Sequence, residues 1–355
     1  MSILHPEYNQ AFEQAFASLA HNLLGSHDAI PDALYHYTPS LDAVQGIAQH
    51  REIWLTNIAY LNDVAELDYI KSFVNDPKLD PSVKGYLERY APMHANFGTQ
   101  VYVMSFSTKP DYLPLWATFT KMKGYCMGFD ACALASEILS KTQLNIDVKK
   151  DHSATHDAIT SLVKSKDSSS EFQGSYGGNY YLAPVLYDRE KQLEILNAIV
   201  APAISNFESI STQPEQCLAQ SVTISNGVEI GRIAKDARAF DAAVNKLLDQ
   251  CATLFKSADF AYEHEWRLVK HMDTNNSNLL RGHFHVREVG GTIVPYIKMG
   301  LRNNLSFPLR SIISAPLALS DTTEEGLSFI LYNSGYHCGY DGVQISKSKI
   351  KLRRF

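Results

Sequence analysis

Two glutamates, Glu263 and Glu265, stand two positions apart in a segment at 262–269 whose residue types are typical of a β-strand. Side chains alternate between the two faces of a strand, so we expect Glu263, Glu265 and Arg267 on one face. Two carboxylates on a rigid element can take different roles in one reaction. One stabilises developing positive charge, while the other positions or deprotonates an acceptor. The same spacing is also typical of a solvated strand face that carries a weak salt bridge. The motif alone leaves both interpretations open.

A histidine and two serines add to this pair. His36 lies between two tyrosines in a short aromatic strand predicted at 33–38, where a neutral imidazole can hydrogen-bond a ligand hydroxyl. Ser105 and Ser107 share one face at the end of a strand predicted at 100–107, and strand ends often carry ligand contacts. Each feature also has a structural explanation, because core histidines find hydrogen-bond partners and strand-end serines satisfy nearby backbone groups.

Motifs that would point to other chemistry are missing from the sequence. It contains no glycine-rich dinucleotide fingerprint, no phosphate-binding loop, and neither the zinc-protease nor the serine-hydrolase signature. His283 and His285 lack an identifiable third ligand and are expected on a strand surface. Asn62, Asp63 and Glu66 are expected to cap a helix. The sequence therefore predicts no metal site.

The composition is that of an ordinary globular protein. Apolar residues make up 45% of the 355 positions and charged residues 20%. The net charge of −6 argues against general nucleic-acid binding, and no run of about 20 apolar residues predicts a membrane span. The five cysteines lack metal or redox spacing, and the N-terminus lacks the features of a secretory signal. We therefore expect a cytoplasmic protein with reduced thiols.

Strands and helices are interspersed irregularly along the chain. Further strands are predicted near 52–56, 124–130, 180–187, 293–297, 312–314 and 342–346. Helices are predicted at 7–25, 41–48, 189–207, 235–256 and 322–335. Because regular strand–helix–strand spacing is absent, the pattern favours an α+β fold over a doubly wound sheet.

The order of the motifs resembles the DUF2971 family. The matching segments are 34–38, 53–56, 61–66, 103–107, 115–117, 124–129, 185–187, 262–267 and 345–350, so the resemblance spans about residues 33–352. We expect a single domain over residues 30–355, preceded by a helical extension at 1–29. Within that domain, residues 131–260 are expected to form a mostly helical insertion.

The candidate site residues also resemble, more distantly, those of mono-ADP-ribosyltransferases, whose signature is Arg-Ser-Glu or His-Tyr-Glu. In this chain His36 takes the first position and Glu265 the third. Ser105 and Ser107 take the second, and Glu263 matches the extra acid of arginine-modifying members. The resemblance implies an ADP-ribosyltransferase-like split mixed β-sheet core with peripheral helices.

The same resemblance implies that NAD is the substrate and that ADP-ribose passes to an acceptor that the sequence does not identify. Glu265 would stabilise the oxocarbenium-like ribose, and Glu263 would orient or deprotonate the acceptor. The residues expected to hold NAD are His36, Tyr37, Ser105, Ser107 and Trp116. The alternatives are an NAD glycohydrolase and a non-catalytic protein- or nucleotide-binding module on the same fold. A toxin or phage-defence role would suit either enzyme.

Overall fold

The computed structural model describes residues 31–61, 66–90, 99–141, 180–211, 244–273, 284–300, 307–318, 323–337, 339 and 342–352. The strands are β1 (Ala33–Thr38), β2 (Glu52–Asn57), β3 (Thr99–Ser107), β4 (Tyr125–Asp130), β5 (Tyr180–Pro184), β6 (Glu265–Asp273), β7 (Phe284–Val289), β8 (Thr292–Gly300), β9 (Leu309–Ser314) and β10 (Gln344–Lys347). The α-helices are α2 (Leu41–His50), α3 (Pro81–Leu87), α4 (Leu113–Thr120), α5 (Ala131–Lys141), α7 (Arg189–Ile195), α8 (Ala201–Ser211) and α11 (Thr323–Asn333), with a further helical segment at 244–254. Shorter helical turns are η1 (Ile58–Tyr60), η2 (Glu66–Phe73), η4 (Leu196–Val200) and η6 (Ala258–Glu263).

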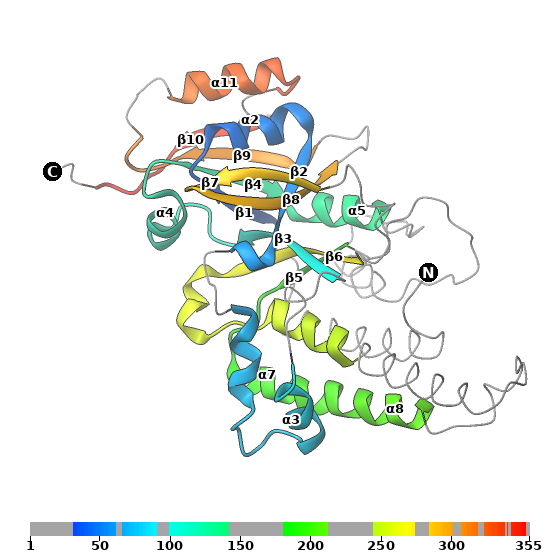
Figure 1. Cartoon of the computed structure of the whole chain (residues 1–355). Helices are drawn as coiled ribbons and strands as arrows, with labels where there is room; N and C mark the ends of the chain where they lie inside the picture. The colour runs from blue at the N-terminus through cyan, green and yellow to red at the C-terminus, as the bar shows by residue number, and fades with distance from the viewer. Residues whose placement is uncertain are drawn as a thin grey trace, which may run out of the picture.

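The strands form one mixed sheet of ten. Their order is β10-β9-β4-β1-β3-β2-β8-β7, with β6 paired to β3 and β5 paired to β6. Neighbouring strands are antiparallel except β10 and β9, which are parallel. Figure 1 shows the sheet in the upper part of the molecule, with α3, α7 and α8 below it. The expected mixture of helices and strands is therefore confirmed at the level of a large mixed sheet with several helices.

The sheet divides beside β3. On one edge of β3, β6 pairs along its whole length, from Thr99 opposite Asp273 to Ser107 opposite Glu265. A strand has two edges, so β1 and β2 share the other one. β1 meets β3 near its end at Ser107, whereas β2 pairs with it at Val103. Two half-sheets, β1-β4-β9-β10 and β2-β8-β7, therefore diverge from the same strand.

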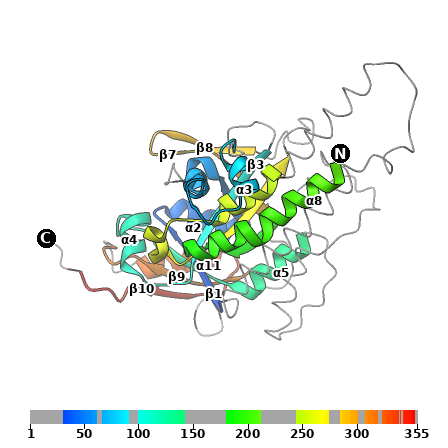
Figure 2. The ribbon, with the colours of Figure 1, turned by 90° about the horizontal axis from the view of Figure 1, so that it is seen from below.

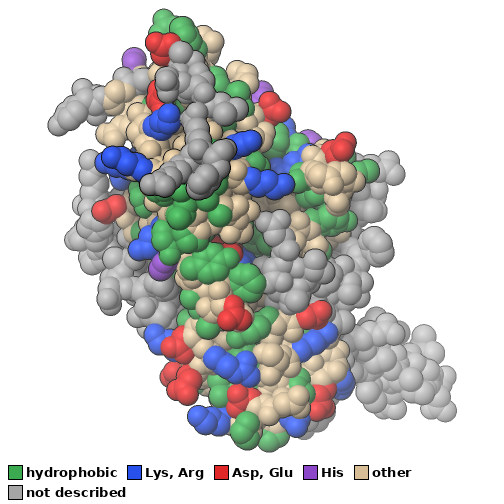
Figure 3. Space-filling view, turned by 90° about the vertical axis from the view of Figure 1, so that its left-hand side faces the viewer, with side chains coloured by type: hydrophobic (Ala, Val, Ile, Leu, Met, Phe, Trp, Pro, Cys, Tyr) green, Lys and Arg blue, Asp and Glu red, His purple; other side chains and the backbone are tan. Residues whose placement is uncertain are grey.

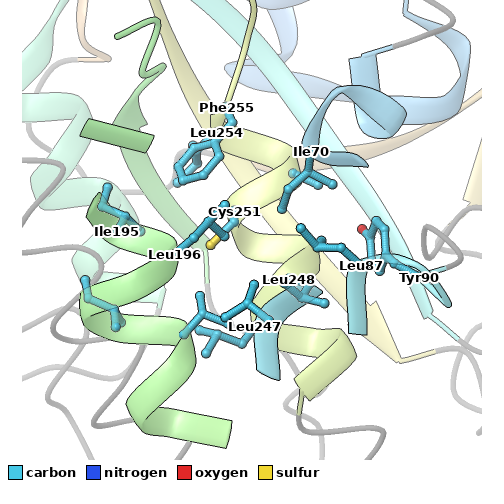
Figure 4. Packing of buried hydrophobic residues seen from close by; sticks show 14 of the residues in the cluster. Ile70, Leu87, Tyr90, Ile195, Leu196, Leu247, Leu248, Cys251, Leu254 and Phe255 are labelled. Atoms are coloured by element: carbon cyan, nitrogen blue, oxygen red, sulfur yellow. The ribbon is translucent and has the colours of Figure 1, made fainter. Parts of the chain in front are cut away.

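Two large apolar cores and a smaller cluster around Tyr37 and Trp116 stabilise this arrangement. One lies where both half-sheets contribute residues together with α2, α5 and α11, and it includes Leu34, Ile53, Phe106 and Phe129. The other joins β3, β5 and β6 to the lower helices. Figure 4 shows its centre, with labelled side chains Ile70, Leu87, Tyr90, Ile195, Leu196, Leu247, Leu248, Cys251, Leu254 and Phe255. Full burial of each leucine or isoleucine stabilises the fold by roughly 1.5–3 kcal/mol.

Local signals in the sequence explain several element boundaries. The Ser40 side chain accepts hydrogen bonds from the backbone N–H groups of Asp42 and Ala43, which caps α2. Pro114 lies in the first turn of α4, where a missing N–H costs nothing. Among the described strands β5 pairs with β6 alone, so Pro184 lies on an edge strand, where proline is tolerated.

Some predictions differ from the structure or lie outside it. β7 contains His285, which the sequence analysis expected on a strand surface without giving the strand's bounds, whereas His283 lies outside the described residues. The predicted extension at 1–29 and the proposed cap at residues 62–65 lie outside the described residues. Within 131–260, the described part is helical apart from β5 and a bridge between Leu186 and Phe255. Figure 2, the view from below, shows α8 crossing the molecule beneath the strands.

Candidate functional site

The two glutamates do not lie on one strand, so that part of the sequence analysis is wrong. η6 ends at Glu263, and β6 begins at Glu265. His264 between them has φ 46°, a left-handed conformation that interrupts the alternation of side chains. The turn nevertheless brings both carboxylates to the same lysine, as the side-chain distances show.

A buried ion-pair network links four residues. The Lys256 Nζ lies 2.6 Å from the Glu263 carboxylate and 3.3 Å from that of Glu265. The Arg267 guanidinium binds both Glu265 oxygens, at 2.8 Å through Nε and at 3.0 Å through a terminal nitrogen. Arg267 also donates to the Thr253 carbonyl at 2.7 Å. The exposed fractions of the four side chains are all 7% or less.

Burial and charge act in opposite directions on the two carboxyls. Burial raises the pKa of Glu263, although the nearby Lys256 ammonium opposes this. Burial would also raise the pKa of Glu265, but the charges of Arg267 and Lys256, together with hydrogen bonds from Arg267 and Ser105, hold it well below its usual range. Glu265 is therefore ionised at neutral pH.

The two serines lie beside this network on β3. Ser105 is opposite Arg267 and Ser107 is opposite Glu265 across the β3–β6 pair, so all four share one face. The Ser107 hydroxyl donates to the Glu263 carbonyl at 2.7 Å and accepts from the Lys109 N–H at 3.1 Å. Ser107 is buried, whereas Ser105 is half-buried and closer to solvent.

His36 contacts β3 from the face of the sheet opposite to the one that carries the two serines, Glu265 and Arg267. Tyr35 pairs with Ser107, so Tyr35 shares the face of Ser107 and Glu265, and His36 lies on the opposite face. There the His36 ring meets the Phe106 ring edge-on. His36 Nδ1 lies 2.9 Å from the Ser105 carbonyl oxygen. Burial and the Arg287 charge lower the pKa of His36, although its bond to Ser105 opposes them, so the ring is neutral. A carbonyl only accepts, so Nδ1 carries the proton and Nε2 is the acceptor.

Tyr37 and Trp116 are core residues. Their rings pack edge to face with centroids 4.9 Å apart, and Trp116 has no exposed surface. The Trp116 Nε1–H donates to Asp111 at 2.7 Å, and the Tyr37 hydroxyl donates to the carbonyls of Lys109 and Pro110. Neither ring presents a face to a ligand in this conformation.

Lys256 is the member of the network that sequence reasoning missed. It follows the helical segment at 244–254, in a stretch with no motif to distinguish it from a surface lysine. Within the described ranges no group of three or more potential metal ligands converges. A search of the same residues found no helix long and apolar enough to cross a membrane.

The fold and the site define the chain as a mixed α/β protein with a buried carboxylate pair where a strand begins beside β3. The family described as "Protein of unknown function (DUF2971)" matches residues 115–268, which include both glutamates. This match confirms the resemblance to DUF2971, over a shorter span than the motifs suggested. No curated protein and no solved structure matched the chain.

Proposed function

We propose that this protein is an NAD-dependent mono-ADP-ribosyltransferase with Glu265 as its catalytic carboxylate. One observation carries the proposal: β3 and β6 are neighbours, so the Ser105 and Glu265 side chains are hydrogen-bonded on one face of the sheet, and His36 on β1 contacts the Ser105 carbonyl from the other face. These three residue types, in this order along the chain, combine the histidine of one transferase signature with the serine and glutamate of the other. The divergence of two half-sheets from β3 is compatible with the split sheet that the resemblance implies.

The proposed reaction breaks the bond between nicotinamide and ribose C1′ of NAD. Nicotinamide leaves with the bonding electrons, and positive charge develops on the ribose. The ionised Glu265 carboxylate binds the 2′-hydroxyl and stabilises this charge. The acceptor then forms a bond to C1′ and loses a proton, which Glu263 or water takes up. The raised pKa of Glu263 makes it a better base than an ordinary exposed carboxylate.

The neutral His36 has a binding role in this proposal. Its Nδ1–H is committed to the Ser105 carbonyl, so Nε2 is left to accept a hydrogen bond from a ribose hydroxyl. Because His36 and Glu265 lie on opposite faces, NAD would have to pass between the two half-sheets that diverge from β3 to reach both. Both Glu265 oxygens are engaged by Arg267, and Lys256 adds a third contact. Lys256 therefore has to leave the carboxylate before the ribose can approach it.

The test is nicotinamide release by the purified protein incubated with NAD. Loss of a transition-state contact costs on the order of 10²–10³ in rate, so Glu265→Gln should lower release by that factor. Glu52→Gln is a matched control, since it removes a partly buried carboxylate from the Glu52–Lys298 pair on β2 and β8. Equal release by the wild type and Glu265→Gln would overturn the assignment.

One observation favours a second candidate, a non-catalytic binding module. Glu265 is only 5% exposed and lies between two cations, which is also the arrangement of a structural ion pair. A module of this kind would release no nicotinamide, and calorimetry would detect no heat from millimolar NAD. An NAD glycohydrolase would release nicotinamide with free ADP-ribose as the other product, which mass spectrometry distinguishes from a modified acceptor.

A further inference from the structure

A half-buried arginine on β7, Arg287, has a buried hydrogen-bond donor that is not used. Its guanidinium donates to the Thr56 hydroxyl at 2.7 Å and lies over the Tyr296 ring, 5.4 Å from the ring centroid. Its Nε is buried and has no hydrogen-bond partner. Buried N–H groups in folded proteins nearly always have an acceptor, so this one indicates a partner that binds from outside the chain.

Arg287 lies on the same face of the sheet as the proposed catalytic carboxylate. Thr56 is opposite both Tyr296 on β8 and Val103 on β3. Tyr296 is in turn opposite the residue two positions before Arg287 on β7. Directly paired residues, and residues two apart on one strand, share a face. The arginine is therefore on the face that carries the two serines of β3 and the Glu265 side chain.

The contact between Arg287 and Thr56 lies where the two half-sheets diverge. Thr56 pairs with β3, whereas the earlier residues of β2 pair with β8 alone among the described strands. On the other half-sheet, the His36 ring binds the Ser105 carbonyl where β1 leaves β3. Burial lowers the pKa of His36 and the Arg287 charge lowers it further, so the two side chains are within electrostatic range of each other.

The acids beside this arginine do not neutralise it. Glu288 follows it on β7, and alternation places the Glu288 side chain on the opposite face. Glu52 shares its face, but it lies four residues from Thr56, about 13 Å along β2. The Glu52 carboxylate is also paired with Lys298 at 3.3 Å. The pKa of Arg287 is lowered by burial and raised by the Tyr296 phenol, with no effect from a carboxylate.

The surface of the sheet region is also rich in cations. Figure 3 shows Lys and Arg side chains gathered across the upper part of one face, where the sheet lies, whereas acidic and basic side chains alternate over the lower helices. A negatively charged ligand would therefore meet little repulsion as it approaches the sheet from this side.

We propose that Arg287 and Thr56 bind the diphosphate of NAD, an inference that rests on the proposed function for the identity of the ligand. Phosphate oxygens accept hydrogen bonds, and the planar arginine fork binds them through paired N–H groups. The Arg287 Nε supplies one donor. The Thr56 hydroxyl accepts from Arg287, which leaves its own proton for a phosphate oxygen.

The position of the site agrees with the path that NAD would have to take. The proposed function places one ribose at Glu265 and the other at His36, on opposite faces of the sheet. The diphosphate joins the two riboses, so it is the part of NAD that would cross where the half-sheets diverge. Arg287 provides a positive charge at that crossing.

The test is calorimetry of the full chain with ADP, which carries the diphosphate and adenosine of NAD but has no nicotinamide to release. We expect ADP to bind at least about tenfold more tightly than adenosine. Arg287→Gln should weaken ADP binding about tenfold to hundredfold, as for loss of hydrogen bonds to a charged group. Thr56→Val removes one hydroxyl and should weaken ADP binding about tenfold. This second variant decides the question if Arg287→Gln does not fold.

Arg310→Gln is the matched control, because Arg310 also lies on a strand of the sheet but is paired with Asp130. It removes the same charge and should leave ADP affinity unchanged. Kinetics with NAD give a second readout. Arg287→Gln should raise the KM about tenfold or more and change kcat less, since the diphosphate is bound alike in the ground state and the transition state.

The outcomes separate this inference from the proposed function. Equal ADP affinity of the wild type and Arg287→Gln, or no binding of ADP by the wild type, would overturn the diphosphate site even if nicotinamide is released. ADP binding that depends on Arg287, without any nicotinamide release from NAD, would uphold the site and overturn the proposed function.

Discussion

The Lys256 ammonium lies 2.6 Å from the Glu263 carboxylate, with both side chains 7% exposed. This contact joins the end of the helical segment at 244–254 to the end of η6, and Lys256 also reaches Glu265 at the start of β6. One lysine thereby holds two like charges together among buried side chains. The stability of the site and its chemistry both depend on this residue.

Removing that lysine should destabilise the fold. Lys256→Met leaves Glu263 buried without its cation, and breaking a buried pair from one side costs about 3–5 kcal/mol. Urea unfolding at pH 7 measures the change. Lys71→Met, in the exposed pair of Lys71 with Asp68, should cost less than about 1 kcal/mol. Equal stability of the two variants would mean that the buried network contributes nothing.

The Ser107 hydroxyl should stabilise the loop before α4. Ser107→Ala leaves the Glu263 carbonyl and the Lys109 N–H without this partner, at a cost of about 1–3 kcal/mol. Hydrogen exchange of the Lys109 amide should accelerate as well. Ser328→Ala removes a single bond within α11 and is the control for loss of a hydroxyl. Unchanged exchange at Lys109 would contradict the bond.

Trp116 should affect stability and not NAD binding. Trp116→Phe keeps an aromatic ring in the core but removes the bond to Asp111, at a cost of about 1–3 kcal/mol. Calorimetry with NAD should give the wild-type affinity, because the side chain is fully buried. A tenfold weaker affinity in a variant of normal stability would restore Trp116 as a ligand contact.

His271 should make stability depend on pH. Burial, with the charges of Lys246 and Lys270, lowers the pKa of His271 to about 3, and its Nε2 lies 3.1 Å from the Tyr181 hydroxyl. Below about pH 6.5 the unfolded chain takes up a proton that the folded protein excludes, so this contribution to stability is present above that pH and is lost as the pH falls.

The stability difference between the wild type and His271→Gln should therefore shrink by about 2 kcal/mol between pH 7 and pH 5. His50→Gln, at an exposed position, is the control and should show no such change. A constant difference across this range would mean that His271 titrates normally in the folded protein.

Local patterns in the sequence predicted most of the strands, because alternation depends on neighbouring residues. They did not predict the left-handed turn at His264, which the fold imposes where η6 meets β6. Nor did they predict Lys256, whose role depends on packing between segments that no local pattern connects. The bounds of β7 were not predicted because its alternation is weak, with exposed valines at 286 and 289.

The candidate site was predicted only in part, because local patterns locate strands but do not fix how the strands pair. Ser105, Ser107 and Glu265 share a face because β3 and β6 pair in register along their length. The face on which His36 lies depends on its pairing with β3, and a one-residue change in register moves a side chain to the opposite face. The strands could be located from the sequence, whereas their register could not.

The most direct measurement is a crystal structure of the Glu265→Gln variant with NAD. We expect the ribose 2′-hydroxyl of the nicotinamide half to lie about 3 Å from the side chain at position 265. The Lys256 ammonium should be displaced from that side chain. A ribose hydroxyl of the adenosine half should lie at hydrogen-bond distance from His36 Nε2. NAD bound elsewhere, or excluded while Lys256 still closes the network, would contradict Glu265 as the catalytic carboxylate.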